Sequence, residues 1–158
     1  MSEPLSPKQK TAAAAVLVAA IAAPLEGLRQ VAYQDPPGIW TVCYGDTHDV
    51  SQTKVYTLAE CKSRLDMQTV KAVEAVEKCH PSLPMNVLVA MSDAAYNLGP
   101  RVACDASYSS VARSLYAGEY NNACRNLLKF DKARVAGVLI TLPGLSKRRK
   151  IESTLCLS

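Results

Sequence analysis

Residues 26–45 read EGLRQVAYQDPPGIWTVCYG, and this stretch decides the expected fold. The tetrapeptide Asp35-Pro36-Pro37-Gly38 forces the chain to reverse within a few residues, because proline and glycine are the strongest turn formers. The β-branched and aromatic residues at 39–44 then predict a short strand, which ends at Gly45. The sequence therefore predicts a turn followed by a small sheet near the N-terminus.

Two carboxylates, Glu26 and Asp35, and the Thr41 hydroxyl flank this reversal. Alternation along the strand places Thr41 on one face with Ile39 and Cys43, where it points into a cleft beside Asp35. Hydrolysis of a glycosidic bond normally uses a pair of carboxylates: one protonates the leaving oxygen, and the other activates water or attacks the sugar. An isolated Glu and Asp would more often be solvated surface acids, so the catalytic interpretation depends on the surrounding pattern.

The pattern around these residues matches that of a known family. Its members share a Glu-Gly pair, a Tyr-x-Asp-x-x-Gly-x-x-Thr motif and a following glycine, which this chain reproduces at Glu26, Gly27, Tyr33, Asp35, Gly38, Thr41 and Gly45. In this pattern the chain resembles the phage-type lysozymes of glycoside hydrolase family 24. Shorter matches at 57–61, 96–99, 118–120 and 144–152 extend the resemblance over most of the chain.

The resemblance implies an endolysin that lyses a bacterial host by hydrolysing the β-1,4 bond between N-acetylmuramic acid and N-acetylglucosamine in peptidoglycan, with inversion. It makes Glu26 the general acid, while Asp35 and Thr41 position and activate water. Three further residues are candidates for substrate binding: Tyr33, Asn97 and Arg148. The habits of asparagine favour a helix cap or a core hydrogen bond for Asn97. We expect no metal and no cofactor.

Two other functions remain open. A lytic transglycosylase would cleave the same bond with the sugar's own hydroxyl, but Asp35 and Thr41 argue against it because such enzymes can work with a single acid. A non-enzymatic, membrane-associated lysis protein would need a longer apolar span if it formed a pore. Internal repeats, zinc-finger spacing and a phosphate loop are absent from the sequence, which gives nucleic acid little support as a partner.

One position departs from the family pattern. Gly45-Asp46-Thr47 stands where many relatives carry Gly-His-Thr, and His48 lies two positions beyond the expected place. The sequence therefore does not predict the buried histidine–carboxylate pair expected of some relatives. We assign no catalytic role to His48.

Length and composition indicate one compact, monomeric enzyme. The chain has 158 residues, 49% of them apolar, and a net charge of +4. Periodicity and capping residues predict helices at 57–78, 85–97, 111–117, 122–130 and 146–155. The expected fold is α+β and lysozyme-like, with a small β-sheet lobe near the N-terminus and a larger helical lobe joined to it by a long helix. The four cations at 147–150 are interpreted as a solvated helix face, or alternatively as a surface that is attracted to an anionic cell wall or envelope.

Residues 11–25 form an uncharged, alanine-rich run after Lys8 and Lys10. At ~1.5 Å per residue the run spans roughly 22 Å, less than the ~30 Å hydrocarbon core, so we do not expect stable spanning. Pro24 should disturb its last helical turn. The run could be a signal peptide cleaved after Ala22, the first helix of a cytosolic enzyme, or a segment resembling the signal-arrest-release segments of some phage endolysins.

The third interpretation is favoured because Glu26 follows the run immediately. Retention in the membrane would hold the acid away from its partners and keep the enzyme silent. On this interpretation residues 1–25 are a signal-anchor-like segment and residues 26–158 the catalytic domain. The protein would first be held transiently in the host inner membrane and then released into the periplasm.

The six cysteines support export, since an even number in a small chain suits an oxidising compartment. Six thiols allow fifteen complete pairings, and buried free thiols remain an alternative. The resemblance implies Cys43–Cys61 and Cys124–Cys156, with Cys79–Cys104 as the third pair. A metal site made from Cys43, His48 and Cys61 fits no familiar zinc spacing.

Overall fold

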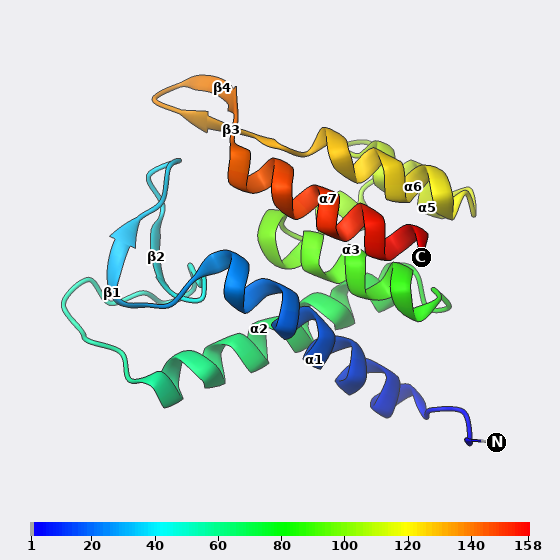
Figure 1. Cartoon of the computed structure of the whole chain (residues 1–158), viewed down its shortest axis with the longest axis horizontal. Coiled ribbons are helices and arrows are strands. Elements are labelled where there is room, and N and C mark those ends of the chain that lie inside the picture. Colours follow the sequence, from blue (N-terminus) through cyan, green and yellow to red (C-terminus); the bar gives the residue numbers. More distant parts are fainter. Residues whose placement is uncertain (1) are drawn as a thin grey trace.

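The computed structural model describes residues 2–158 as a helical body that carries two small β-hairpins (Figure 1). The helices are α1 (Pro7–Glu26), α2 (Leu58–Cys79), α3 (Met85–Leu98), α4 (Arg101–Cys104), α5 (Ser110–Tyr116), α6 (Tyr120–Asn126), the short 3-10 helix η1 (Leu127–Lys129) and α7 (Pro143–Leu157). The strands are β1 (Arg29–Gln34), β2 (Trp40–Cys43), β3 (Lys132–Val135) and β4 (Val138–Thr141). The predicted α+β fold with a small N-terminal sheet and a long connecting helix is confirmed.

Helix α3 is the centre of the helical body. Its residues 87–95 are all buried, because α1, α2 and α7 pack around it and leave no face for solvent. A helix buried on every side must be apolar all round, and this one reads MNVLVAMSDAAYNL. The one charged residue in that run, Asp93, therefore needs a buried partner.

Helix α1 is an integral part of this core in the folded protein. A capping box between Ser6 and Gln9 starts the helix. The inner face of the helix consists of four buried small or branched residues: Ala14, Ala15, Val18 and Ala22. The predicted disturbance at Pro24 does not end the helix, which continues to Glu26. A proline removes only one helical hydrogen bond, and Gly27 then stops the helix at a positive φ of 72°.

The small lobe is the antiparallel hairpin β1–β2, which places Tyr33 opposite Thr41. The alternation that predicted Cys43 on the same face of the strand as Ile39 and Thr41 fails at Cys43, because its left-handed φ of 58° turns the chain out of the strand. The Cys43 sulfur is bonded to Cys61 at the start of α2. A second, small core of Val42, Cys43, Tyr56 and Cys61 fills the space between the lobe and this helix.

The hairpin β3–β4 is a feature that the sequence did not predict. Figure 1 shows it projecting from the body at the start of α7. Its turn places Ala136 and Gly137 at φ 49° and 81°, and positive φ at both central residues is typical of the type I′ turns that close two-residue hairpins. The turn carries Ala136-Gly137 in place of the usual Asn-Gly or Asp-Gly signal, although alanine is poorly suited to a positive φ.

Three disulfides join the elements, with the pairing that the resemblance implies. Cys43–Cys61 joins the small lobe to α2, Cys79–Cys104 joins α2 to α4, and Cys124–Cys156 joins α6 to α7. Helix α1 contains no cysteine. It is therefore held in the core by packing and polar contacts alone.

Candidate active site

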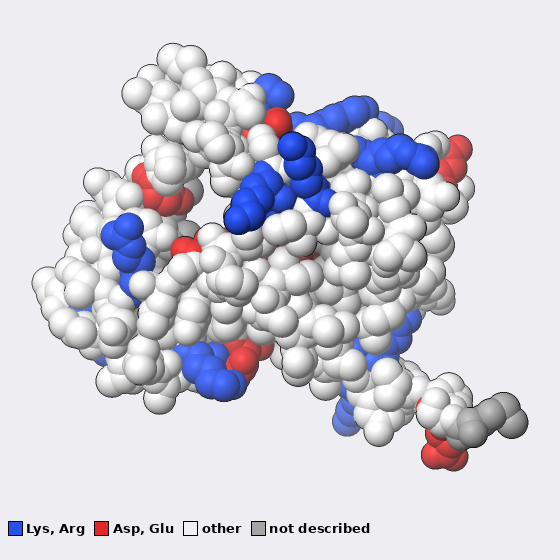
Figure 2. Space-filling model, in the orientation of Figure 1, with Lys and Arg blue, Asp and Glu red and all other residues white. Residues whose placement is uncertain are grey.

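A cleft of about 610 Å³ separates the small lobe from the helical body. Its walls include five of the residues that the sequence singled out: Glu26, Tyr33, Asp35, Thr41 and Asn97. Figure 2 shows a hollow on this face beneath the small projecting lobes, with acidic atoms beside it and Lys and Arg atoms on the helical side. The sixth candidate, Arg148, lies behind the cleft wall.

Glu26 enters the cleft from the last turn of α1. Its Oε1 accepts hydrogen bonds from Arg148 Nη1 and, at 3.4 Å, from Asn97 Nδ2. Its Oε2 lies against Gly45, where an added Cβ would collide with it. Because Gly45 also has a φ of 73°, both the backbone conformation and the packing against Glu26 require glycine at this position.

Arg148 is buried, with 3% of its surface exposed, and binds two acids at once. Its Nε and Nη2 donate to the two oxygens of Asp93 at 2.8 and 2.9 Å, while Nη1 reaches Glu26. Burial alone would lower the pKa of Arg148, but the hydrogen bonds and charges of Asp93 and Glu26 raise it above its usual range. The guanidinium is thus a fixed cation that orients Glu26.

The interpretation of 147–150 as a solvated face is wrong for its two arginines, since only Lys147 and Lys150 are exposed. Arg149 is buried and donates to Glu152 Oε1 at 2.6 Å. Burial raises the pKa of Glu152, and neighbouring Asp93 raises it further. The sequence did contain a signal: Asp93 is the one charged residue of a largely apolar helix, and a buried carboxylate requires a partner such as a cation.

Asp35 and Thr41 face the cleft from the tip and the second strand of the β1–β2 hairpin. Asp35 Oδ1 accepts from the Ile39 amide at 2.7 Å, and the Asp35 carbonyl accepts from the Gly38 amide at 2.8 Å. Thr41 is buried and donates its hydroxyl proton to the Ile39 carbonyl at 2.9 Å. These bonds close the predicted turn and leave Asp35 Oδ2 and the lone pairs of the Thr41 hydroxyl available.

Two tyrosines complete the walls. Burial, followed by the charge of Glu26, raises the pKa of Tyr33 and, more strongly, that of Tyr96. The Tyr96 hydroxyl donates to the Tyr44 carbonyl at 2.6 Å and so links α3 to the small lobe. The sequence did not predict this contact between the two lobes. Within residues 2–158 no group of three or more acidic, His or Cys side chains is arranged to hold a metal ion.

Comparisons with known proteins agree with this geometry. Residues 23–152 match the family model described as "Phage lysozyme". The chain is 36% identical over 132 residues to an endolysin of Acyrthosiphon pisum secondary endosymbiont phage 1, covering 82% of this chain and 88% of that protein. It is 34% identical over 137 residues to the SAR-endolysin of Enterobacteria phage P21, covering 84% of this chain and 78% of that protein.

A solved structure shows the same fold. The muramidase domain of SpmX from Asticaccaulis excentricus superposes with a TM-score of 0.73 at 28% identity, covering 92% of this chain and 95% of that one. The resemblance stated from the sequence motif is confirmed by these matches.

Proposed function

Because this chain belongs to the phage lysozyme family, we propose that it hydrolyses the β-1,4 bond between N-acetylmuramic acid and N-acetylglucosamine, with Glu26 as the general acid. The family makes the chain a peptidoglycan-degrading endolysin of the glycosidase class. The observation that carries the finer proposal is one cleft that collects Glu26, Asp35 and Thr41. These are the groups that acid-assisted attack by water requires.

The two oxygens of Glu26 have different surroundings, which suggests how the acid works. Oε1 accepts from both Arg148 and Asn97, so the negative charge is best stabilised on that oxygen. Oε2 accepts no side-chain hydrogen bond from the described residues and lies at the cleft beside Gly45. In the proposal the proton resides on Oε2 and passes to the leaving oxygen, while Arg148 stabilises the carboxylate that results.

Asp35 and Thr41 hold the attacking water from the opposite lobe. The Thr41 hydroxyl proton is committed to the Ile39 carbonyl, so its oxygen can only accept a hydrogen bond from water. Asp35 Oδ2 is available to take the other proton of that water as general base. Attack by water on the face opposite the leaving group gives inversion.

Product analysis tests the reaction directly. Purified protein is incubated with isolated peptidoglycan, and the glycan fragments are examined by mass spectrometry and, at early times, by NMR. Hydrolysis predicts fragments with reducing ends that appear first as the α-anomer. Anhydro ends would instead identify a lytic transglycosylase, and uncut glycan would support the non-enzymatic alternative.

We also propose that the protein is held in the host inner membrane through α1 before release into the periplasm. Helix α1 has 20 residues, which at ~1.5 Å each approaches the ~30 Å hydrocarbon core, and it is long and apolar enough to cross a membrane. The uncharged run predicted from the sequence covers residues 11–25, and the helix extends beyond it at both ends, from Pro7 to Glu26. Val16 and Leu17 are 69% and 47% exposed in the folded enzyme, although both favour a lipid environment.

The covalent framework is compatible with such a release. All three disulfides lie outside α1, so α1 can leave the core or dock into it without thiol chemistry. Because Glu26 is the last residue of α1, withdrawing the helix removes the acid from Arg148. Docking of α1 would therefore switch the enzyme on.

Substitutions on the exposed face of α1 test this proposal without damaging the core. Val16→Asp with Leu17→Asp should leave the activity of purified protein on cell walls unchanged, because both side chains face solvent in the folded state. The same pair should abolish membrane association and host lysis in cells. Val138→Asp, equally exposed but on β4, is the matched control. Normal membrane association of the α1 variant would refute the proposed anchor.

A further inference from the structure

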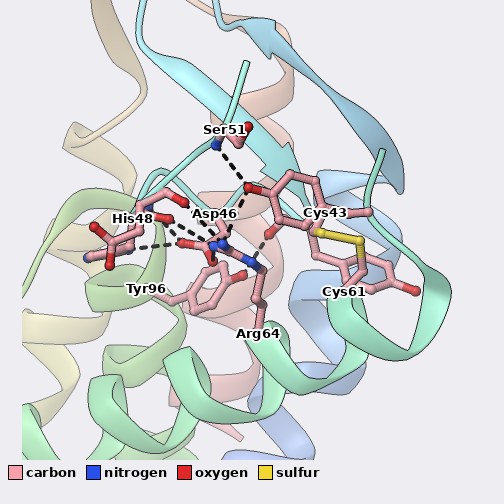
Figure 3. Close-up of polar contacts among 10 residues, drawn as sticks. Cys43, Asp46, His48, Ser51, Cys61, Arg64 and Tyr96 are labelled. Atoms are coloured by element: carbon pink, nitrogen blue, oxygen red, sulfur yellow. Dashed lines mark hydrogen bonds and ion pairs between the residues drawn. A yellow bond between two sulfur atoms is a disulfide. The ribbon is translucent and has the colours of Figure 1, made fainter. Parts of the chain in front are cut away.

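Asp46 is buried in the wall of the cleft. Figure 3 shows Arg64 reaching it from α2. Arg64 Nη1 binds Asp46 Oδ2 at 2.7 Å and also donates to the His48 carbonyl at 2.8 Å, while Nη2 donates to the Asp49 carbonyl at 3.1 Å. One guanidinium therefore holds both the carboxylate and the turn that follows it.

The same carboxylate fixes the ring of His48. Asp46 Oδ1 accepts from the His48 backbone amide at 2.9 Å and lies 2.9 Å from the ring Nδ1 (Figure 3). In the tautomer with its proton on Nδ1 the ring donates to Asp46, because a carboxylate oxygen accepts. In the neutral ring Nε2 is then an acceptor.

The imidazole is not needed to hold the turn. Arg64 and the His48 amide already bind Asp46, and two backbone bonds of 2.9 Å join Asp46 to Val42. Yet the His48 side chain lines the cleft and is 65% exposed. A ring that is exposed to the cleft and oriented by the buried Asp46 carboxylate of a part-buried ion pair is placed to contact a ligand rather than to stabilise the fold.

We infer that His48 contacts the glycan, its Nε2 accepting a hydrogen bond from an acetamido N–H or a sugar hydroxyl, and that Asp46 and Arg64 are positioning residues that act through His48. This inference rests on the proposed function, because the ligand is the glycan in the same cleft. It also assigns a role to Asp46, whose carboxylate lies on the loop while the cation that binds it lies on α2.

Steady-state kinetics on soluble, uncrosslinked glycan strands test the contact. His48→Ala and His48→Phe should each raise KM about threefold to tenfold, the loss expected for one hydrogen bond, with kcat and the unfolding midpoint unchanged. The Phe variant keeps the ring but lacks Nε2, so it separates hydrogen bonding from bulk. Asp49→Asn is the matched control, because Asp49 is exposed on the same turn and outside the cleft lining.

A double-mutant cycle tests the positioning role. Asp46→Asn should raise KM when His48 is present and add little in the His48→Ala background, whereas a purely structural role would give the same change in both. Unchanged KM in both His48 variants would overturn the inference while leaving hydrolysis by the wild type intact. Failure of the wild type to cut the strands would instead count against the proposed function.

Discussion

The two walls of the cleft are held in different ways. On the helical side, Glu26 is bound to the buried Arg148, which is itself bound to Asp93 inside the core. On the small lobe, Asp35 and Thr41 are held by short-range bonds to the backbone of their own hairpin. Glu26 is therefore fixed by charges contributed by distant segments, whereas Asp35 and Thr41 are fixed by local turn chemistry.

This contrast predicts that the helical wall is the more costly to disturb. Arg148→Met leaves the buried Asp93 without its cation and should destabilise the protein by about 3–5 kcal/mol, as for other broken buried pairs. Arg64→Met, which frees the Asp46 loop of the small lobe from α2, should cost only about 1–3 kcal/mol, because Arg64 is 20% exposed and Asp46 keeps its bonds to His48. Urea denaturation of both variants measures the difference. Equal losses would contradict the proposed asymmetry.

The contact between the two walls can be disturbed at Gly45. Gly45→Ala should reduce kcat by about 10²-fold, the scale expected for a misplaced catalytic group, because the new Cβ displaces Glu26. Gly118→Ala is the matched control, since Gly118 has the same φ of 73° but open space around it. Both variants carry the backbone strain of a left-handed alanine, about 1–2 kcal/mol. Only Gly45→Ala should lose activity.

The lobe wall can be tested alone at Thr41. Thr41→Val keeps the shape but removes the hydroxyl that accepts from water in the proposed mechanism, and kcat should fall roughly tenfold to a hundredfold, the equivalent of about 1–3 kcal/mol. KM should stay constant, because in that mechanism the side chain contacts water and not sugar. A rise in KM at unchanged kcat would show that Thr41 binds the glycan instead.

The smallest expected effect concerns pH. Burial raises the pKa of Glu152 in the folded protein above its ordinary value of 4.5, so the folded state keeps a proton that the unfolded chain loses. The free energy of unfolding should therefore fall as pH rises above about 4.5. Glu152→Gln should flatten this part of the profile, measured by urea denaturation at several pH values, whereas Glu74→Gln at an exposed site should not. An unchanged slope in Glu152→Gln would contradict the assignment.

Local patterns in the sequence predicted much of the fold. The helices predicted at 57–78 and 85–97 correspond to α2 and α3. A Thr57–Glu60 capping box starts α2, and Gly99 ends α3. The turn at 35–38 was equally readable, because proline and glycine restrict the backbone directly. Such features depend on neighbours within four residues, so no tertiary information is needed.

Long-range pairing was harder to predict. Arg148 was interpreted as a surface cation because its partners Glu26 and Asp93 lie far away in the chain. The partner of Arg149 is Glu152, three residues on in the same helix, and this spacing was a local hint. Arg64 and Asp46 are likewise joined across 18 residues and two elements. The β3–β4 hairpin was missed because Ala136 occupies a conformation that alanine rarely adopts.

The rate at which Glu26→Gln clears isolated cell walls is the most direct test of Glu26 as the acid. The change removes the proton donor but keeps the side-chain shape, and Arg148 retains its two bonds to Asp93. We expect kcat to fall by about 10²–10⁴-fold, the usual contribution of a general acid, with the unfolding midpoint little changed. Wall clearing at near the wild-type rate by the folded variant would contradict the assignment of Glu26.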